Sequence, residues 1–513
     1  MSYLRLICYL MIAVYATGGI AVASSPTYQL WPASSMSKIL PDQTKPRDAS
    51  DEITLYAAKG ERESAQLIIA AGNEPLKNVQ VSLGSLSGPG GALTQIELCR
   101  VAYIELPNLK KIAPDPLPPA TLFDVEANTN QPIWITITVP HNAEPGEYSG
   151  HLLVKPANAA EKRMPIRLKV WNFALPDGPS HVTAFGLNQQ WIAQQHGVEN
   201  DSAAAKRLYA KYYDFLVDHW VSPYNLPVDV TSERASRYIK DPKVTSFTIP
   251  YSDDVEQIRK SVESLRSRGL LDKGYFYPID EPFTEDAYKR LYEVCDKIHS
   301  IDPKLRIVIP YFRDPDFDAG GKTIHELADG KLNIWCPNID YFNSNKERLY
   351  AKLALGEEFW WYVCCGPGSP FPNYFLDMDG ISHRVLPSMG WAYKCQGLLY
   401  WSTTWWSDSG QGTTDPWTDM ATVKDINKDL YGDGSLLYPG KKVGVDGPVS
   451  SIRLELLREG LEDHEYLVLL EKKLGRSAVE KLVSKLITAP NDFNRDVKEW
   501  EKVRIQIGEE LSK

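Results

Sequence analysis

Cysteine is scarce in this chain, and its spacing does not suit a metal site. Only 7 cysteines occur among 513 residues, and no two form a C-x-x-C pair. Structural zinc sites are usually built on such pairs, so we expect no bound metal. Cys8 lies in the first apolar segment, and six cysteines follow it. An even number permits disulfides in an exported protein, but Cys295, Cys336 and Cys364 lie in apolar runs typical of buried free thiols.

The chain also lacks excess positive charge and has no second long apolar segment. Its formal net charge is −10, which argues against a nucleic-acid partner and against docking on an anionic membrane. The long apolar stretch 6–23 follows Arg5 and ends in Ala21-Val22-Ala23, the pattern of a cleavable secretory signal. An uncleaved anchor is the alternative. We expect a signal peptide over 1–23, a secreted or periplasmic protein and no membrane span.

Motifs of several enzyme classes are missing. No complete Walker loop and no G-x-S-x-G elbow occur, and His325-Glu326 lacks the second histidine of a zinc protease. Asp314, Asp316 and Asp318 resemble the start of a calcium loop, but Ala319 replaces the required glycine. We therefore expect no cofactor.

The chain divides into three parts by its pattern of apolar residues. Residues 24–178 contain short runs rich in Val, Ile, Thr and aromatics between Gly, Pro and Asn, which predicts a β-sandwich. Residues 179–445 alternate strand patterns with amphipathic helices such as 204–219, 253–268 and 284–300, which predicts a (β/α)₈ barrel of the TIM type. Residues 446–513 predict helices packed on the barrel, the first over 451–475. The expected barrel strands are 182–187, 221–227, 244–250, 274–280, 305–312, 332–339, 358–365 and 397–403.

Asp280 and Glu281 stand where the fourth of these strands ends, directly before Pro282. Carboxylates beside a core are usually paired or functional, and the carboxyl ends of barrel strands carry the active site. The alternative is that the triplet only starts the next helix, with Asp near the N-cap and Glu285 and Asp286 in the first turn.

Tryptophan and tyrosine are concentrated between residues 335 and 417. Aromatic faces stack on the apolar faces of sugar rings, although core packing must use some of these residues. The loop 402–417 is too polar for a core, so Trp405 or Trp406 is expected in a cleft.

Paired carboxylates at this place suggest glycoside hydrolysis. A retaining enzyme of the usual design needs an acid and a nucleophile about 5 Å apart. The seventh strand, 358–365, ends without a carboxylate, and Glu357 and Glu358 lie at its opposite end. The remaining design uses the substrate's 2-acetamido oxygen as the nucleophile. Glu281 then acts as the acid and base, while Asp280 holds the acetamide N–H.

The barrel segment resembles glycoside hydrolase family 123, in its adjacent Asp-Glu pair and in the stretch 432–466 beginning GDGSLLYPG. The N-terminal segments GERESAQLIIAA and VPHNAEPGEYSGHLLV are similar to the same set. The resemblance implies an exo-acting N-acetyl-β-galactosaminidase that removes terminal β-linked N-acetylgalactosamine. It implies Asp280 as the acetamide-orienting residue and Glu281 as the acid/base. Further substrate contacts are expected at Tyr311, Asn338, Trp361, Trp401 and Trp405.

Two other functions remain open at this point. One is a glycosidase for a sugar without an acetamide, with a second carboxylate such as Asp377, Asp379 or Asp408 from a loop. The other is a glycan-binding protein without catalysis. Tyr311 is also compatible with a capping role and Asn338 with an ordinary turn.

Overall fold

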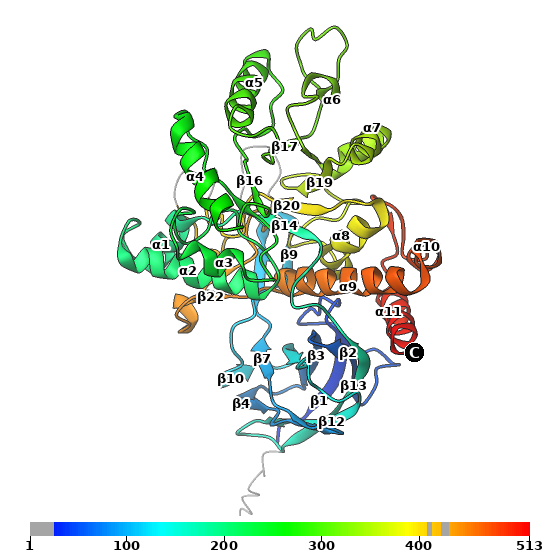
Figure 1. The fold of residues 1–513 in the computed structure, drawn as a ribbon. Coiled ribbons are helices and arrows are strands. Elements are labelled where there is room, and N and C mark those ends of the chain that lie inside the picture. The colour runs from blue at the N-terminus through cyan, green and yellow to red at the C-terminus, as the bar shows by residue number, and fades with distance from the viewer. Residues whose placement is uncertain (1–24, 408–412, 422–429) are drawn as a thin grey trace, which may run out of the picture.

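A computed structural model describes residues 25–407, 413–421 and 430–513. The predicted signal peptide and Asp408 lie outside the described residues. Within them, strands β1–β13 form an N-terminal domain of β-sheets, and strands and helices alternate in the part that follows (Figure 1). This confirms a multi-domain chain with a sheet-rich N-terminal domain and a helix-containing C-terminal domain.

Two sheets build the N-terminal domain. Their inner faces share one apolar core, which includes Ile133, Ile135 and Ile137 from one sheet and Leu152 and Leu168 from the other. Most pairs are antiparallel, but β2 and β13 pair in parallel. The first sheet has the order β1 (Tyr28–Ser34), β3 (Arg62–Ala71), β11 (Asn130–Thr138), β7 (Ile96–Arg100); the second has the order β10 (Phe123–Val125), β4 (Leu76–Ser82), β12 (Gly146–Lys155), β13 (Lys162–Ala174), β2 (Ile53–Lys59), with β5 (Leu86–Gly88) and β6 (Gly91–Leu93) beside β12.

The C-terminal domain contains a five-stranded parallel sheet rather than eight regular strands. Its order is β14 (Val182–Phe185), β20 (Gly397–Tyr400), β19 (Glu358–Val363), β18 (Ile334–Pro337), β17 (Val308–Tyr311). The expected third and fourth strands shrink to a parallel pair, β15 (Phe247–Thr248) and β16 (Gly274–Tyr275). The expected second strand is reduced to a single bridge between Phe185 and Pro223. Prolines explain the shortening, because proline has no backbone N–H to donate to a neighbouring strand. The expected second strand contains Pro223 and Pro227, and the next two contain Pro250 and Pro278.

The parallel strands bury one common set of side chains between them. Residues of six strands form this inner cluster: Ala184, Tyr275, Val308, Ile334, Cys336, Trp360, Tyr362 and Leu399. The opposite faces pack against the helices, as Trp361 does against Phe342. The helices of this layer include α2 (Ala203–Asp218), α4 (Val255–Ser267), α5 (Glu285–His299), α7 (Phe342–Ala354) and α8 (Gly380–Tyr393).

Helix α9 (Ile452–Leu474) lies between the two domains, followed by α10 (Arg476–Val483) and α11 (Val497–Ser512) (Figure 1). Its bounds agree with the predicted helix 451–475 to within one residue. Gly460 lets α9 press against α8, because a Cβ there would lie 2.2 Å from the carbonyl oxygen of Arg384. Helix α9 thus faces α8 of the C-terminal domain on one side and the β-sheets of the N-terminal domain on the other.

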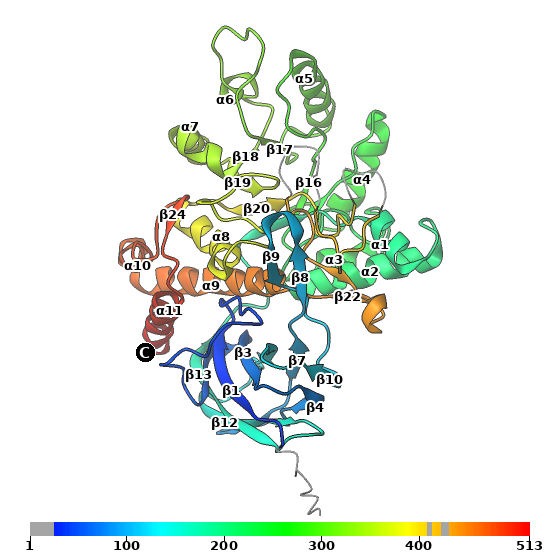
Figure 2. The same cartoon turned by 180° about the vertical axis from the view of Figure 1, so that it is seen from behind.

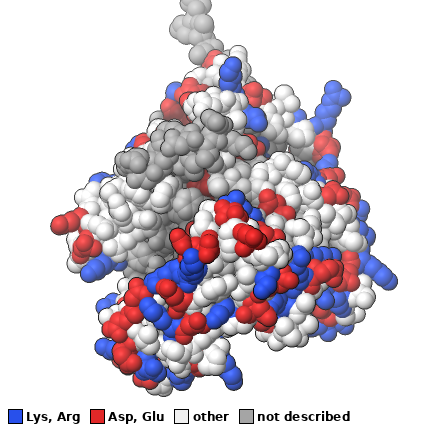
Figure 3. Space-filling view, turned by 90° about the horizontal axis from the view of Figure 1, so that it is seen from above, with Lys and Arg blue, Asp and Glu red and all other residues white. Residues whose placement is uncertain are grey.

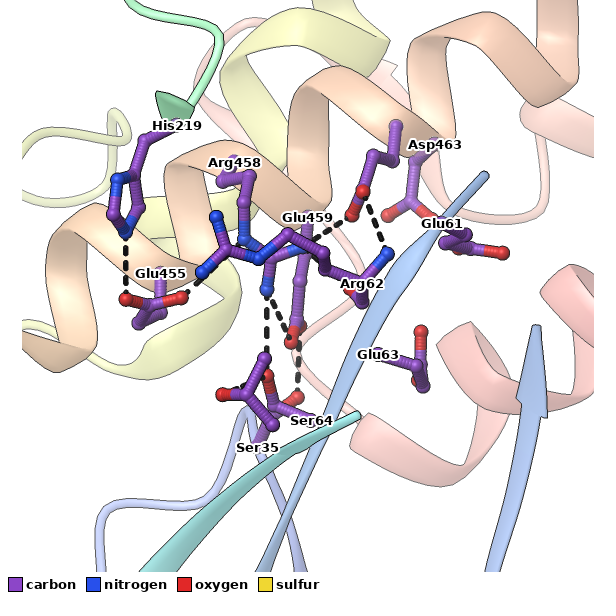
Figure 4. Close-up of polar contacts among 12 residues, drawn as sticks. Ser35, Glu61, Arg62, Glu63, Ser64, His219, Glu455, Arg458, Glu459 and Asp463 are labelled. Carbon is purple, nitrogen blue, oxygen red and sulfur yellow. Dashed lines mark hydrogen bonds and ion pairs between the residues drawn. The ribbon is translucent and has the colours of Figure 1, made fainter. Parts of the chain in front are cut away.

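Buried charges join α9 to the N-terminal domain (Figure 4). Arg458 donates to Ser64 Oγ at 3.3 Å, and Ser35 Oγ donates to Glu459 Oε2 at 2.9 Å. The backbone N–H of Arg62 donates to Glu462 at 3.0 Å. Because a buried charged group is costly to leave without its hydrogen-bond partner, these contacts fix how the two domains sit.

A hairpin of the N-terminal domain reaches the C-terminal domain. Strands β8 (Tyr103–Leu106) and β9 (Lys111–Pro114) project past α9 (Figure 2). Asp115, at the end of the hairpin, forms an ion pair with Arg453 at 2.9 Å, and neither side chain is exposed.

No helix among the described residues is long and apolar enough to cross a membrane. On the face that Figure 3 shows, outside its grey residues, Lys and Arg are interspersed with Asp and Glu, without an extended basic surface.

Candidate active site

Asp280 and Glu281 follow β16 at the edge where the parallel strands end. They do not cap the next helix, since the N-cap of α5 is Thr284, whose side chain accepts from the N–H of Ala287. Glu285 and Asp286 do occupy the first turn, as the helix-start reading required. The two preceding acids are therefore free of that structural task.

Tyrosines from the inner cluster hold both carboxylates. Tyr277 donates its hydroxyl to Asp280 Oδ1 at 2.7 Å, and Tyr362 of β19 donates to Glu281 Oε1. Tyr362 belongs to the inner cluster, and Tyr277 packs against it. Each acid is therefore tied by a hydrogen bond to a tyrosine at the inner face of the strand arrangement, at one end of it.

The chain bends sharply to bring neighbouring acids to the same side. Neighbouring side chains of an extended strand point to opposite faces. Glu281 has φ of +44°, in the left-handed region that costs a residue with a Cβ about 1–2 kcal/mol. Strain of this kind persists where the surrounding contacts hold it, and the Tyr362 hydrogen bond does so here.

Glu281 is half-buried and Asp280 is exposed. Burial raises the pKa of Glu281 above its ordinary value, and the negative charge of Asp280 adds to the effect. The hydrogen bond from Tyr362 opposes it. A carboxyl group with a raised pKa is suited to deliver a proton near neutral pH.

Asn338 lies at the same edge, directly after β18. It forms a parallel bridge with Tyr362, and its amide donates to the carbonyl oxygen of Gly366 at 3.3 Å. Its Oδ1 accepts from the N–H of Asp340, so it also serves the local turn. The neighbouring Cys364 and Cys365 are free thiols with their sulfurs 3.8 Å apart.

Trp401 and Trp405 follow β20 and pack on each other with ring centroids 5.0 Å apart. Both rings are half-buried. Trp401 Nε1 donates to Asp433 Oδ1 at 3.1 Å. Trp406 is instead buried and donates to the carbonyl oxygen of Leu437, so it belongs to the core.

In the structure, Tyr311 and Trp361 do not lie with this group. Tyr311 is buried on the helix-facing side, and its hydroxyl lies 3.0 Å from Nε2 of His325. Trp361 is fully buried against Phe342 and Phe359. Both side chains take the outward direction of their strands, opposite to Tyr362, because neighbouring strand residues alternate.

Two of the three expected loop carboxylates, Asp377 and Asp379, lie within the described residues, and a further carboxylate lies beside Trp401. Asp379 caps α8 and pairs with Arg495, and Asp377 is exposed two residues earlier. The sequence reasoning overlooked Asp433, which is fully buried beside Trp401. Its signal was an acid between two glycines in GDGSLLYPG. No cluster of three or more His, Cys, Asp or Glu able to hold a metal occurs in the described part of the chain.

Comparison with known families decides the membership. The sequence model described as "Glycoside hydrolase 123, catalytic domain" matches residues 210–470, and that of the glycoside hydrolase 123 N-terminal domain matches residues 38–156. The chain belongs to glycoside hydrolase family 123. As a member of this family, the protein is a glycoside hydrolase that acts on a glycan. No functionally curated protein matches the sequence.

A solved structure agrees with this family-123 membership at the level of the fold. A family 123 glycoside hydrolase from Clostridium perfringens, described in a study of glycolipid glycan hydrolysis, has 15% identity and a TM-score of 0.67, with 95% of this chain and 97% of that chain covered. A family 39 glycoside hydrolase from Bacteroides cellulosilyticus has 10% identity and a TM-score of 0.34, covering 80% and 81%. The latter is too dissimilar to inform the site.

Proposed function

We propose that the protein is an exported, exo-acting retaining glycosidase that removes terminal β-linked N-acetylgalactosamine by substrate assistance. The observation that carries this is the pair Asp280 and Glu281, turned to one side by two tyrosines, with Glu281 made less acidic by burial. The active-site set is Asp280, Glu281, Asn338, Trp401 and Trp405.

In the proposed reaction the substrate supplies its own nucleophile. Asp280 accepts the acetamide N–H, and the acetamide oxygen attacks C1 as the glycosidic C–O bond breaks. Glu281 gives its proton to the departing oxygen. Water then attacks C1 of the cyclic intermediate as the bond from C1 to the acetamide oxygen breaks, and the water gives a proton to Glu281. This restores the acetamide, the acid and the original configuration at C1.

The domain boundaries of the sequence analysis are part of this proposal: a β-sandwich over 24–178, a barrel over 179–445 and covering helices over 446–513. Hydrogen bonds between the short segments support a closed barrel. Tyr224 N–H donates to the carbonyl oxygen of Phe185, Thr248 N–H to that of Tyr224, and Phe276 N–H to that of Arg306. These bonds connect the five-stranded sheet to β15 and β16 at both ends.

Aryl β-N-acetylgalactosaminides with good and poor leaving groups test the proposal. Glu281→Gln should lose about 10²–10⁴-fold in kcat/KM for a poor leaving group and much less for a good one, since only the former needs the proton. Asp280→Asn should slow formation of the cyclic intermediate for both. Equal loss for both leaving groups in Glu281→Gln contradicts the assignment.

A stable thiazoline analogue of the cyclic intermediate tests substrate assistance separately. It should inhibit the wild-type enzyme competitively, and Asp280→Asn should weaken that inhibition. If the wild type cleaves galactosides as fast as N-acetylgalactosaminides, the acetamide has no role and the proposal fails.

A further inference from the structure

Asp433 is a fully buried carboxylate with one oxygen in use and one without a partner. Oδ1 accepts from Trp401 Nε1 at 3.1 Å and from the Tyr400 hydroxyl at 3.2 Å. Oδ2 is buried and has no hydrogen-bond partner among the described residues. Burial raises the pKa of Asp433 to about 6, against the opposing hydrogen bonds of Trp401 and Tyr400. An unsatisfied buried carboxylate oxygen is costly, so a donor is expected there.

The turn that carries Asp433 packs closely against Trp401 and is held by hydrogen bonds from Arg453. Gly432 and Gly434 have φ of +81° and +69°, and a Cβ on Gly434 would lie 2.3 Å from the Trp401 ring. Arg453 donates to the carbonyl oxygens of Gly432 at 2.7 Å and Ser435 at 2.6 Å. The carboxylate therefore keeps its position against Trp401 without rearrangement, as a positioning group requires.

This turn lies against the segment that follows β20, since the N–H of Trp405 donates to the carbonyl oxygen of Gly434 at 2.8 Å. A hydrogen bond with Cys364 lowers the pKa of the exposed Cys365 thiol, while burial and the negative charges of Asp433 and Glu281 oppose that shift. Both carboxylates thus lie within electrostatic reach of one thiol. Trp401, which donates to Asp433 Oδ1, is only half-buried, so part of this side chain is accessible beside the buried carboxylate.

We propose that Asp433 positions the terminal sugar by accepting a hydrogen bond at Oδ2 from one of its non-reacting hydroxyl groups, while the ring stacks on Trp401. The inference rests on the proposed function and adds to it a residue that selects the sugar. A pyranose ring has an apolar face and a rim of hydroxyl groups. The aromatic ring can stack on the face, and the carboxylate at the edge of that ring can accept from a hydroxyl. Such a hydrogen bond discriminates strongly between a sugar that has the hydroxyl and an analogue that lacks it, because the analogue leaves the buried carboxylate without a donor.

Deoxy substrates paired with Asp433→Asn test this. The probes are an aryl β-N-acetylgalactosaminide and its analogues without O3, O4 or O6. We expect one analogue to lose about 10- to 100-fold in kcat/KM with the wild-type enzyme, because hydrogen bonds to charged groups are the strong ones. Asp433→Asn should lose a similar factor on the parent sugar and then be indifferent to that same hydroxyl. Asp446→Asn, an exposed partner of Lys211, is the control and should match wild type.

Three results overturn the proposal. Wild-type indifference to every single hydroxyl excludes the contact, and it needs no variant to fold. If Asp433→Asn loses as much kcat/KM on the deoxy substrate as the wild type does, and unfolds at the same temperature, the carboxylate has a structural role instead. Rescue of Asp433→Asn turnover by azide identifies a nucleophile instead. If the wild type cleaves no N-acetylhexosaminide at all, the proposed function fails first and this inference with it.

Discussion

At the scale of single residues, the two neighbouring acids are distinguished by their surroundings rather than by their chemistry. Asp280 is exposed and bound by Tyr277, whereas Glu281 is half-buried and bound by Tyr362. A hydroxyl that donates to a carboxylate stabilises its ionised form and lowers its pKa. Tyr362 therefore sets how readily Glu281 holds the proton that the proposed reaction needs.

Tyr362→Phe should move the alkaline limb of the pH profile upward. Glu281 must be protonated to act as an acid, so activity falls as pH rises through its pKa. Removing the Tyr362 hydroxyl removes a contact that lowers this pKa, which then rises, and we expect the limb of kcat/KM to shift by about one pH unit. Steady-state kinetics from pH 4 to 9 measure it.

Tyr224→Phe is the matched control for this experiment. Tyr224 packs against the same inner cluster, but its hydroxyl donates to the carbonyl oxygen of Tyr400. Its removal should leave the limb in place. An equal shift in both variants means that the effect comes from loosening the cluster and not from the bond to Glu281.

At the scale of elements, the sequence predicted long periodic segments well and side-chain direction poorly. The helices 204–219, 284–300 and 451–475 agree with α2, α5 and α9 to within one residue, because apolar spacing and capping residues mark their ends. Helix α8 escaped prediction since Pro387 lies inside it and nearly every position is buried. A buried helix has no polar face to reveal its period.

The direction of strand side chains could not be predicted because both faces of a parallel strand are buried. Without a polar face, nothing in EFWWYV indicates whether Trp361 or Tyr362 points inward. The acid pair was predictable from its place after an aromatic run. For Asp433 the only signal was an acid between two glycines; its place beside Trp401 could not be predicted, since the turn is held by Arg453, 21 positions after Gly432.

Gly434→Ala tests the turn that carries Asp433. A methyl group there meets the Trp401 ring at 2.3 Å, so the ring or the turn must shift. We expect kcat/KM for the aryl substrate to fall at least about 10-fold, since small displacements at a reacting site are costly. Gly444→Ala is the control: its φ of +74° imposes similar backbone strain, but no atom lies within 4 Å of its Cβ. Equal losses in the two variants contradict the role of the turn.

At the scale of the whole molecule, carboxylates outnumber arginines in the interface around α9. Glu61, Glu63, Glu455, Glu459, Glu462 and Asp463 share Arg384, Arg458 and Arg504. Burial raises the pKa of Glu462 to about 8, although Arg458 opposes the shift. The folded protein therefore binds a proton that the unfolded chain releases at lower pH.

The interface should make stability decrease toward alkaline pH. The folded-state pKa of Glu462 lies above the unfolded value, so its stabilising contribution is full below about pH 4.5 and is lost as pH rises toward 8. We expect the free energy of unfolding to fall by about 2 kcal/mol between pH 6 and 8. Glu462→Gln, which mimics the protonated group, should reduce that slope. Urea unfolding at both pH values measures it.

Glu480→Gln controls for the loss of a negative charge alone. Glu480 lies on α10, half exposed, in a pair with Arg476. Its replacement should leave the pH slope unchanged. A wild-type slope that survives in Glu462→Gln would show that other groups of the protein release the proton.

The ion pair between Asp115 and Arg453 has a consequence for anyone who builds chimeras of this enzyme. The guanidinium group of Arg453 pairs with Asp115 of the N-terminal domain and also donates hydrogen bonds to the turn that carries Asp433. Transplanting the C-terminal domain alone, or exchanging its partner for an unrelated sugar-binding module, leaves that guanidinium buried and without its counter-ion. The N-terminal sheet domain is therefore a structural part of the enzyme and must be transferred together with the C-terminal domain.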